Sequence, residues 1–458
     1  MPESFRIEHD TMGEVRVPAS ALYGAETQRA VENFPISRMR FGRAFINALG
    51  LVKFAAARAN QQVGSVPAPL AGAIETAAKE VMDGRHDSQF VVDLFQTGSG
   101  TSTNMNANEV IATRATALLG KSVHPNDHVN RSQSSNDVFP TALHIAAART
   151  AQQALLPAID ALGQALDTKR KEFWDILKIG RTHLQDAVPI RLGQEFSGYA
   201  RQVELSQSRI RQALEGLYEL PLGGTAVGSG LNANPEFARA AIGIIAEQTG
   251  LPFREAQNHF EAQAARDAAV FLSGALKSYA IALTKIANDI RWLGSGPRCG
   301  LGELQLPEVQ PGSSIMPGKV NPVIAESVLM VCAQVIGHDT AISWGAAAGA
   351  FELNTMMPLI AYDLLESIEL LGAASRKFTE RCIAGLEANE TRLKDTIEQS
   401  LALATALTPE IGYERAAALA KTAYESGRTI REVGDEQSGI PREKLTKLLD
   451  PMNMVGPA

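Results

Sequence analysis

Heptad-spaced apolar residues constrain the fold of this chain more than any other feature of its sequence. In residues 262–294, apolar side chains alternate steps of four and three, which is the spacing of one continuous helical seam. The residues of this seam are Leu272, Leu276, Tyr279, Leu283, Ile286, Ile290 and Leu293. Residues 187–219 repeat the pattern with Leu192, Phe196, Tyr199, Val203, Ile210 and Leu217. The sequence therefore predicts long helices that pack side by side.

Five such helices are expected, over residues 138–178, 187–219, 262–294, 322–349 and 357–384. A helix of about 40 residues spans roughly 60 Å, so these segments predict a long central bundle. Pro157 is expected to kink the first of them. Because Ala and Leu occupy more than one face, the bundle is expected to pack against copies of itself.

Shorter helical patterns flank the bundle, at residues 45–61, 71–82, 104–119, 389–406, 411–426 and 441–450. The first 40 residues show no sustained period and are expected to form extended or turn structure. Strand signals are weak throughout, so the predicted class is mostly α. Three domains are expected: a mixed, mainly helical N-terminal domain over 1–133, the long-helix bundle over 134–388 and a small helical domain over 389–458.

Composition argues against several classes of partner and of site. The chain carries 50 acidic and 43 basic residues, a net charge of −7, so neither nucleic acid nor a membrane surface is an expected partner. The apolar stretch 322–351 is interrupted by polar residues and makes a poor membrane span. Three widely spaced cysteines indicate neither a disulfide framework nor a zinc site. A charged N-terminus is unlike a signal peptide, and a cytoplasmic location is expected.

Four polar loops, three of which contain glycine, interrupt or precede the helices, at residues 96–108, 130–137, 180–186 and 310–321. They are rich in hydroxyls, amides and backbone donors, which suits binding of a small carboxylate or phosphate. Any one of them is explained as well by turns and helix caps, because Ser, Thr, Asn and Gly favour both. Four in one chain favour a binding site.

The fourth loop resembles a phosphate-binding loop only superficially. Five residues separate Gly312 from Gly318, where that motif has four, and Val320 replaces its metal-binding hydroxyl residue. Instead, the loop presents hydroxyls and amides beside the charge of Lys319, and Asn321 caps the next helix. This combination is suited to negative charge that develops on a carboxylate oxygen.

Isolated titratable residues carry weaker signals. His183 lies in a polar turn, where a surface or capping role is the more common one, and Glu326 in an apolar helix is expected to pair with a cation or an imidazole. His144 and His338 are interpreted as packing or surface residues. No cluster has metal-ligand spacing, and residues 223–230 lack the glycine order of a dinucleotide site.

Together, the four loops resemble the signatures of the fumarase/aspartase superfamily. The strongest match is GSSIMPGKVNP at 312–322, supported by TGSGTSTNMNANEV at 97–110, HPNDHVNRSQSSNDVFPTA at 124–142 and GRTHLQDAVP at 180–189. The chain is similar to the iron-free class II fumarases along nearly its whole length. SSND at 134–137 and TGSGTS at 97–102 favour fumarases over aspartases, which typically read STND and GGAGTS.

The resemblance implies a three-domain fold and a homotetramer. In that family, the long five-helix bundles of four subunits form a twenty-helix core, and three chains contribute to each active site. The family uses no metal and no cofactor. Its members hydrate fumarate reversibly to (S)-malate in the tricarboxylic acid cycle, through an aci-carboxylate intermediate.

The resemblance also implies roles for individual residues. The dicarboxylate would be bound by Ser99, Gly100, Thr101, Ser134, Ser135, Asn136, Thr182, Ser314, Lys319, Val320 and Asn321. The catalytic residues would be Ser313 as the proton-abstracting base, His183 paired with Glu326, and Lys319. A second, non-catalytic dicarboxylate site would use His124, Pro125, Asn126 and Asp127. The chain has Lys121 where many members have Arg, which weakens the expectation for this second site.

Several alternatives stay open from the sequence. Ser313 is intrinsically a poor base and needs support from amides and Lys319, while His183 would act on the departing hydroxyl. Which group is acid and which is base is not decided by the sequence. An aspartase-type ammonia lyase uses the same carbanion chemistry, and some relatives of argininosuccinate lyase serve as non-catalytic lens crystallins.

Overall fold

The computed structural model describes residues 4–456 and is mostly α-helical, as expected. The described chain forms two compact units. The first takes the described part of Met1–Pro157 together with Ser208–Ala280 and Ala333–Gly372. The second takes Ala158–Gln207, Ile281–Cys332 and the described part of Ala373–Ala458. The three-domain division at residues 133 and 388 stays a prediction.

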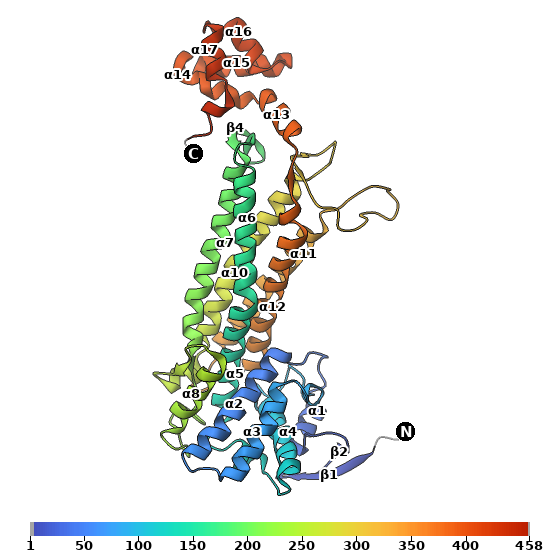
Figure 1. Ribbon diagram of the computed structural model, residues 1–458, viewed down its shortest axis with the longest axis vertical. Coiled ribbons are helices and arrows are strands. Elements are labelled where there is room, and N and C mark those ends of the chain that lie inside the picture. The colour runs from blue at the N-terminus through green and yellow to red at the C-terminus, as the bar shows by residue number, and fades with distance from the viewer. Residues whose placement is uncertain (1–3, 457–458) are drawn as a thin grey trace. The chain divides into compact units, whose positions relative to one another are not determined.

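The N-terminal part of the first unit begins with a β-hairpin, in agreement with the extended or turn structure expected there (Figure 1). Strands β1 (Phe5–Asp10) and β2 (Gly13–Pro18) pair antiparallel. Helices α2 (Arg43–Gln62), α3 (Ala68–Met82) and α4 (Thr101–Leu119) follow close to their predicted ranges. Helix α2 packs against α3 and against α5 (Ser135–Thr150), with the rings of Phe41, Phe45 and Phe139 in mutual contact. This packing positions the starts of α4 and α5.

Helix α1 (Ala25–Asn33) was not expected, because the start of this helix lacks a local capping side chain. Its cap comes from α4 instead. The buried carboxylate of Glu109 accepts hydrogen bonds from the backbone N–H groups of Gly24, Glu26 and Thr27, at 2.9, 2.9 and 3.1 Å. A carboxylate at a helix N-terminus satisfies the free donors and complements the helix dipole.

The predicted helix over 138–178 is wrong in its continuity and in its end. Helix α5 is followed by a π-helical segment, Ala151–Leu155, and then by α6 (Leu156–Glu172). Because Pro157 has no N–H and its ring crowds the preceding turn, the wider π-helical turn lies just before it. The chain then forms β3 (Leu177–Thr182) and β4 (Gln185–Arg191), an antiparallel hairpin where helix was expected.

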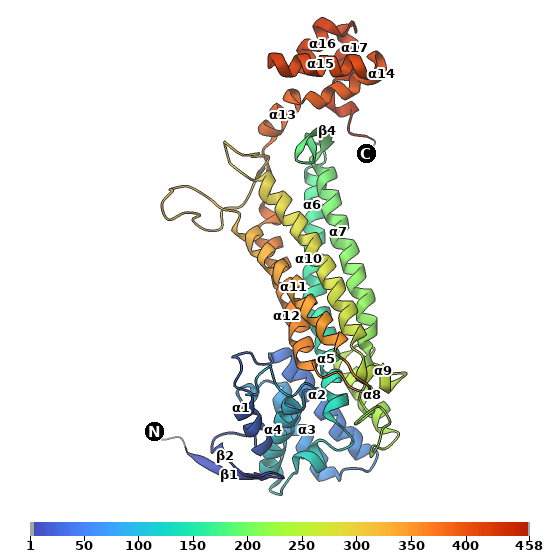
Figure 2. The same ribbon diagram turned by 180° about the vertical axis from the view of Figure 1, so that it is seen from behind.

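Four long helices contribute residues to both units. They are α7 (Leu192–Leu214), α10 (Asp267–Leu293), α11 (Val323–Ala347) and α12 (Met357–Arg381). The α10 seam from Leu272 to Leu293 is at most 5% exposed at every position, which confirms the heptad prediction. Figures 1 and 2 show these helices as bundle elements. In the second unit, the Tyr199 hydroxyl on α7 donates to Asp289 Oδ2 on α10 at 2.9 Å.

Helices α10 and α11 are long and apolar enough to cross a membrane by length and composition alone. Core helices of soluble proteins pass the same test. In the first unit, the Ser273 hydroxyl on α10 donates to Asp339 Oδ1 on α11 at 2.8 Å, and Lys277 contacts the same carboxylate. The part of these helices in the first unit therefore meets through polar contacts as well as through apolar ones.

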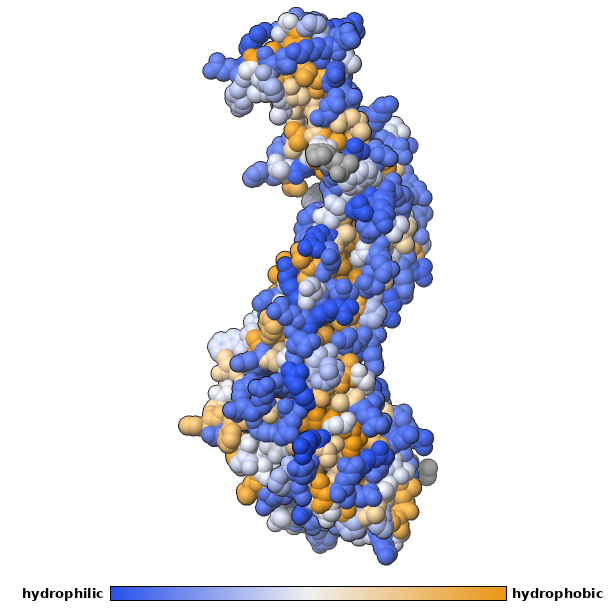
Figure 3. Space-filling model, turned by 60° about the vertical axis from the view of Figure 1, so that its left-hand side comes forward, coloured by the Kyte–Doolittle hydropathy of each residue, from blue (hydrophilic) through white to orange (hydrophobic). Residues whose placement is uncertain are grey.

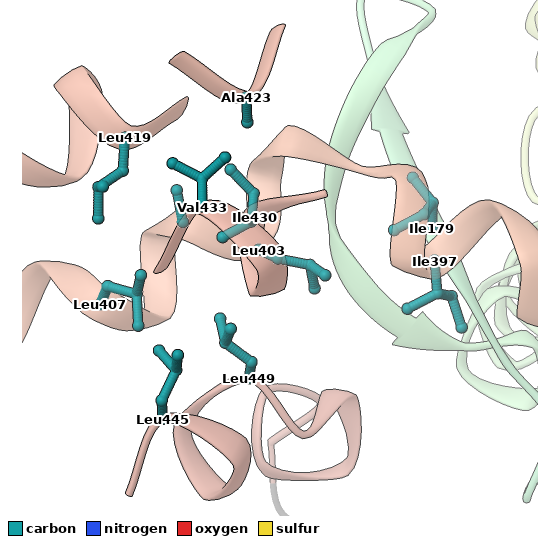
Figure 4. Packing of buried hydrophobic residues seen from close by; sticks show 11 residues of the cluster. Ile179, Ile397, Leu403, Leu407, Leu419, Ala423, Ile430, Val433, Leu445 and Leu449 are labelled. Atoms are coloured by element: carbon teal, nitrogen blue, oxygen red, sulfur yellow. The ribbon is translucent and has the colours of Figure 1, made fainter. Parts of the chain in front are cut away.

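The C-terminal segment forms a small helical core in the second unit (Figure 4). Its helices are α13 (Glu390–Gln399), α14 (Thr408–Ile411), α15 (Tyr413–Ser426), α16 (Ile430–Gln437) and α17 (Arg442–Leu448). The predicted helix over 389–406 ends early, because Ser400 caps a new 3₁₀ segment, Leu401–Leu407. Ile179 of β3 packs into this core beside Ile397, which anchors the β3–β4 hairpin.

The remaining elements are short. Helix α8 (Phe237–Thr249) was not expected, and α9 (His259–Ala264) is separate from α10. Two-residue strands pair in parallel as β5 (Glu219–Leu220) with β6 (Arg254–Glu255), and antiparallel as β7 (Leu304–Gln305) with β8 (Glu387–Ala388).

Candidate active site

Two helix N-termini meet through their hydroxyl groups in the first unit. Thr101 begins α4 and Ser135 begins α5, and their hydroxyl oxygens are 2.6 Å apart. The Ser99 hydroxyl lies 2.7 Å from that of Thr101. Helix N-termini offer unpaired N–H groups and a positive dipole end, so this arrangement favours an anion.

Glycine is required where the 96–108 loop approaches its neighbours. Gly100 has φ of 72°, and a Cβ there would lie 2.0 Å from the Phe139 ring. A Cβ on Gly98 would lie 1.8 Å from the carbonyl oxygen of Thr355. These two residues therefore let the loop pack directly on α5 and on the chain before α12.

The start of α5 is fixed by a capping box and by a distant loop. Ser134 and Asp137 cap each other's backbone, and Asp137 Oδ2 also accepts N–H groups of Gly223 and Thr225 at 2.9 and 3.0 Å. Burial raises the pKa of Asp137 to about 6, against the lowering effect of these backbone donors. The Asn136 side-chain amide donates to the carbonyl of Ala226 at 2.8 Å. The 223–230 segment, rejected as a dinucleotide site, is thus a wall beside α5.

A pocket of about 430 Å³ opens beside these helix starts. The predicted site residues on its wall are Thr101, Ser134, Ser135, Asn126 and Asp127. Its other polar lining residues were not named individually as site residues: Asn104, Asn130, Arg131, Ser132, Gln133, Thr225 and Asn232. Asn104 lies in the predicted 96–108 loop, one helical turn after Thr101, and residues 130–133 lie in the predicted 130–137 loop. Thr225 and Asn232 lie outside the four predicted loops.

The segment expected to form the second dicarboxylate site is a single π-helical turn, Pro125–Val129. His124 Nδ1 accepts the backbone N–H groups of Asn126 and Asp127 at 3.3 and 3.1 Å. It also lies 3.4 Å from Asp127 Oδ2, but a nitrogen that accepts two N–H groups carries no proton for an ion pair. Asn126 and Asp127 line the same pocket as Thr101.

His183 lies at the tip of the β3–β4 hairpin in the second unit. Thr182 pairs with Gln185, and the two turn residues His183 and Leu184 have φ of 56° and 61°. Positive φ at both positions is the two-residue hairpin geometry that usually takes Asn or Gly. Both side chains are exposed. Unfavourable backbone geometry of this kind concentrates at functional sites.

A buried ionic network supports the base of this hairpin. The Lys178 ammonium, 1% exposed, donates to both carboxylate oxygens of Glu195 on α7 at 3.0 Å. It also lies 3.1 Å from Glu303 Oε2, and Arg181 pairs with the other oxygen of Glu303. Glu303 is fully buried, so one carboxylate between two cations holds the strand that precedes His183.

The 310–321 loop is an exposed excursion that precedes α11 (Figures 1 and 2). The Ser313 hydroxyl accepts backbone N–H groups from Ile315 and Met316 at 3.2 and 2.9 Å. The Lys319 ammonium donates to Asn321 Oδ1 at 2.8 Å, and the Asn321 amide donates to the carbonyl of Gly312. A Cβ on Gly312 would lie 2.3 Å from the carbonyl oxygen of Lys319, so glycine closes this loop. Ser314 and Val320 are exposed on the same loop.

Glu326 has no ion-pair partner among residues 4–456. Glu326 lies in the first turn of α11 and is exposed. Across residues 4–456, no ion pair joins Glu326 to His183 or to a cation. The pairing of Glu326 with a cation or an imidazole stays a prediction, because its side of α11 is not covered by described residues.

The predicted residues are divided between the units. Ser99–Thr101, Ser134–Asn136 and His124–Asp127 belong to the first unit, and Thr182, His183, the 310–321 loop and Glu326 belong to the second. In the described part of the chain, no group of three or more His, Cys, Asp or Glu residues is arranged to hold a metal ion.

Comparisons with known proteins agree with the motifs. A lyase family model matches residues 13–337, and a model described as fumarase C C-terminus matches residues 403–456. The chain is 56% identical to fumarate hydratase class II of Mycobacterium tuberculosis (strain CDC 1551 / Oshkosh), over 98% of this chain and 96% of that protein. It is 53% identical to fumarate hydratase class II of Methylorubrum extorquens, over 99% and 97% of the two chains.

Solved structures give the same result. A class II fumarase from Schistosoma mansoni superposes with a TM-score of 0.96 at 40% identity, over 98% of this chain and 99% of that one. A Brucella melitensis protein described as fumarate lyase:delta crystallin bound to cobalt has a TM-score of 0.94 at 47% identity, over 99% and 100%. By sequence along its full length and by fold, the chain belongs to the class II fumarate hydratase family of lyases.

Proposed function

We propose that this chain catalyses the reversible anti hydration of fumarate to (S)-malate, as a hydro-lyase of the tricarboxylic acid cycle. The observation that carries the proposal is full-length similarity to class II fumarate hydratases, with 56% identity to one of them. The meeting of two helix N-termini in a hydroxyl-lined pocket supports a dianionic substrate. A cytoplasmic location is part of the same proposal.

One substrate carboxylate binds at the helix starts of the first unit. Ser99, Thr101 and Ser135 form a chain of hydroxyls that donate to carboxylate oxygens, and the N-termini of α4 and α5 add positive potential. Gly100 keeps the backbone close, and Ser134 and Asn136 hold the turn before α5. Thr182, Ser314, Lys319, Val320 and Asn321 bind the remainder of the dicarboxylate.

Ser313 removes the proton from the carbon next to the carboxylate. Its oxygen accepts two backbone N–H groups, which stabilises negative charge on that oxygen and makes a serine alkoxide less costly. The resulting aci-carboxylate carries extra negative charge, which Lys319, Asn321 and the N-terminus of α11 stabilise. Removal of one such donor typically costs about 2.7–4 kcal/mol of transition-state stabilisation.

His183, oriented by Glu326, acts on the departing hydroxyl. The exposed position of His183 at a hairpin tip allows its ring to reach a substrate bound by other loops. Glu326 is exposed as well. His183 of one subunit can therefore pair with Glu326 of another subunit. In this order of steps, Ser313 is the base and His183 is the acid.

The active unit is a homotetramer with a twenty-helix core and sites built from several chains. Large apolar side chains are exposed on the bundle helices: Ile281 and Trp292 on α10, and Met330, Ile336 and Trp344 on α11. Figure 3 shows hydrophobic surface among hydrophilic surface over the bundle. Exposed apolar faces on long helices are typical of subunit contacts.

The charges around His124–Asp127 predict only weak binding at the proposed second dicarboxylate site. Asn126 and Asp127 face the pocket, yet Glu26 adds a carboxyl group that is hydrogen-bonded to Asn126. Burial, with the charge of Glu109, raises the pKa of Glu26. Lys121 supplies a monodentate cation where Arg would bind a carboxylate with two donors.

The proposal is tested by supplying purified protein with malate and, separately, with aspartate, and following the ultraviolet absorbance of fumarate. We expect fumarate to form from malate and not from aspartate. Formation from aspartate alone would identify an ammonia lyase, and no formation from either would indicate a non-catalytic use of the fold. The relatives named as class II fumarate hydratases or fumarases support neither alternative.

Activity should survive exhaustive treatment with EDTA. The reason is that the proposed chemistry uses a hydroxyl, an imidazole and fixed positive charge, with no step that needs a Lewis acid. The measurement is malate turnover before and after chelation and dialysis, with metal content checked by mass spectrometry. Loss of turnover that a single divalent metal restores would contradict the metal-free mechanism.

A further inference from the structure

A lysine lies buried behind the pocket of the first unit. Lys53 is on α2 and is 0% exposed. Its ammonium donates to Asn130 Oδ1 at 2.9 Å and to Gln133 Oε1 at 3.0 Å. Both of these amide residues line the pocket next to Thr101 and Ser135. The steps of the proposed reaction do not use this cation.

The ammonium fixes the orientation of both amides, because it donates hydrogen bonds and accepts none. The Asn130 amide nitrogen is thereby directed to the carbonyl of Gln133, at 3.2 Å. The Gln133 amide nitrogen donates to the carbonyls of Val129 and Arg131, at 3.1 and 3.0 Å. Asn104 on α4 also donates to Asn130 Oδ1, at 3.3 Å. Lys53 is therefore the centre of a network that shapes the turn before α5.

The charge of Lys53 is not cancelled by direct contact with a carboxylate. None of the ion pairs in the described part of the chain includes it. Asp137 on α5 is the charged group that favours its protonated form, and Asn104, Asn130 and Gln133 are the uncharged groups around it. Burial lowers the pKa of Lys53 to about 7, with Asp137 opposing that effect.

We infer that Lys53 is a positioning residue for dicarboxylate binding, which acts through Asn130 and Gln133 and adds positive potential beneath the pocket. Gln133 directly precedes Ser134, so holding Gln133 also holds the hydroxyls that begin α5. A buried cation acts more strongly than an exposed one, because the low local dielectric screens it less. The inference rests on the proposed function and names a further residue for it.

The direct test is Lys53→Met, which keeps the length of the side chain and removes its charge and donors. Gln133 Oε1 then loses its partner and Asn130 Oδ1 keeps only the Asn104 amide, so we expect KM for malate to rise by about 10- to 100-fold, with a smaller change in kcat. The matched control is Lys169→Met. Lys169 is also buried, but it donates to the carbonyl of Leu386 and to Glu172, neither of which is a proposed site residue. The control should retain the wild-type KM.

A double-mutant cycle separates positioning from a general loss of structure. If Lys53 acts through Gln133, then Gln133→Leu should raise KM as well, and the double variant should cost little more than the worse single variant. Unfolding temperature and light-scattering mass are measured for each variant. A KM in Lys53→Met equal to that of the wild type would overturn the inference. So would fully additive effects in the double variant.

The pH dependence of binding is a second readout. Protonated Lys53 favours a dianion, so affinity for succinate, a non-reacting dicarboxylate, should fall as pH rises through about 7. Deprotonation of Asp137 near pH 6 acts in the same direction at lower pH. In Lys53→Met, the change in succinate affinity near pH 7 should disappear and the change near pH 6 should remain. Calorimetry measures the affinity at each pH. An unchanged profile would contradict the inference.

The inference about Lys53 can still be tested if the wild type is inactive or if Lys53→Met does not fold. If the wild type turns over neither malate nor fumarate, the proposed function is wrong. The role of Lys53 is then tested only by comparing the succinate affinity of the wild type with that of Lys53→Met by calorimetry. If Lys53→Met does not fold, the pair Asn130→Ala and Gln133→Leu replaces it, because the inference requires these amides to control KM. A wild-type KM in both of those variants would overturn it.

Discussion

Replacing Ser313 with alanine should lower malate turnover by about 10²- to 10⁴-fold, the usual contribution of a positioned acid or base. The Ser313 oxygen accepts N–H groups from Ile315 and Met316, which is the environment that a proton-abstracting alkoxide needs. Because the loop is exposed and closed by Gly312 and Asn321, the variant should fold and assemble like the wild type. The measurement is kcat with malate, alongside light-scattering mass.

The matched control for this variant is Ser438→Ala. The Ser438 hydroxyl likewise accepts a backbone N–H two residues ahead, from Ile440 at 3.1 Å, but it lies in the C-terminal helical segment. That variant should retain turnover, since it loses the same kind of turn contact without a role in proton transfer. Wild-type turnover in Ser313→Ala would remove this serine from the mechanism.

Much of the fold could be predicted because its signals are local in sequence. The α10 seam is a repeated spacing within one helix, and every member from Leu272 to Leu293 is buried. Helix α1 could not be found in this way, since its cap, Glu109, comes from a residue more than 80 positions later, as in the Gly24 hydrogen bond. The β3–β4 hairpin was missed because His183 and Leu184 occupy turn positions that normally take Asn or Gly.

The candidate site divides in the same manner. Thr101, Ser134 and Ser135 were identified from their motifs, and they line the pocket of the first unit. Lys53 gave no signal, because a lysine within an apolar helix is ordinary in sequence and its partner Asn130 is 77 residues away. Only the packing of α2 against α5 brings the ammonium behind the pocket.

Two inactive variants, Ser313→Ala and His183→Asn, should restore activity to each other when they are refolded together. The physical reason is that the proposed sites take Ser313 and His183 from different chains of a symmetric tetramer. Asparagine suits the test because it tolerates the positive φ of 56° at residue 183, so the hairpin turn is preserved. With random mixing, about one site in four would receive an intact copy of both residues.

The experiment compares the co-refolded mixture with each parent refolded alone, at the same total protein concentration, with mass from light scattering and activity from malate turnover. A double variant that carries both substitutions in one chain is the matched control, since mixing it with itself can produce no intact site. If subunits share the site, His183 and Glu326 of one subunit should be exposed and not paired with each other. Both are exposed, and no ion pair joins them in the described chain. Recovery up to about a quarter of wild-type activity is the expected result. A fully active monomer, or mixed tetramers no more active than their parents, would mean that each chain holds a complete site of its own.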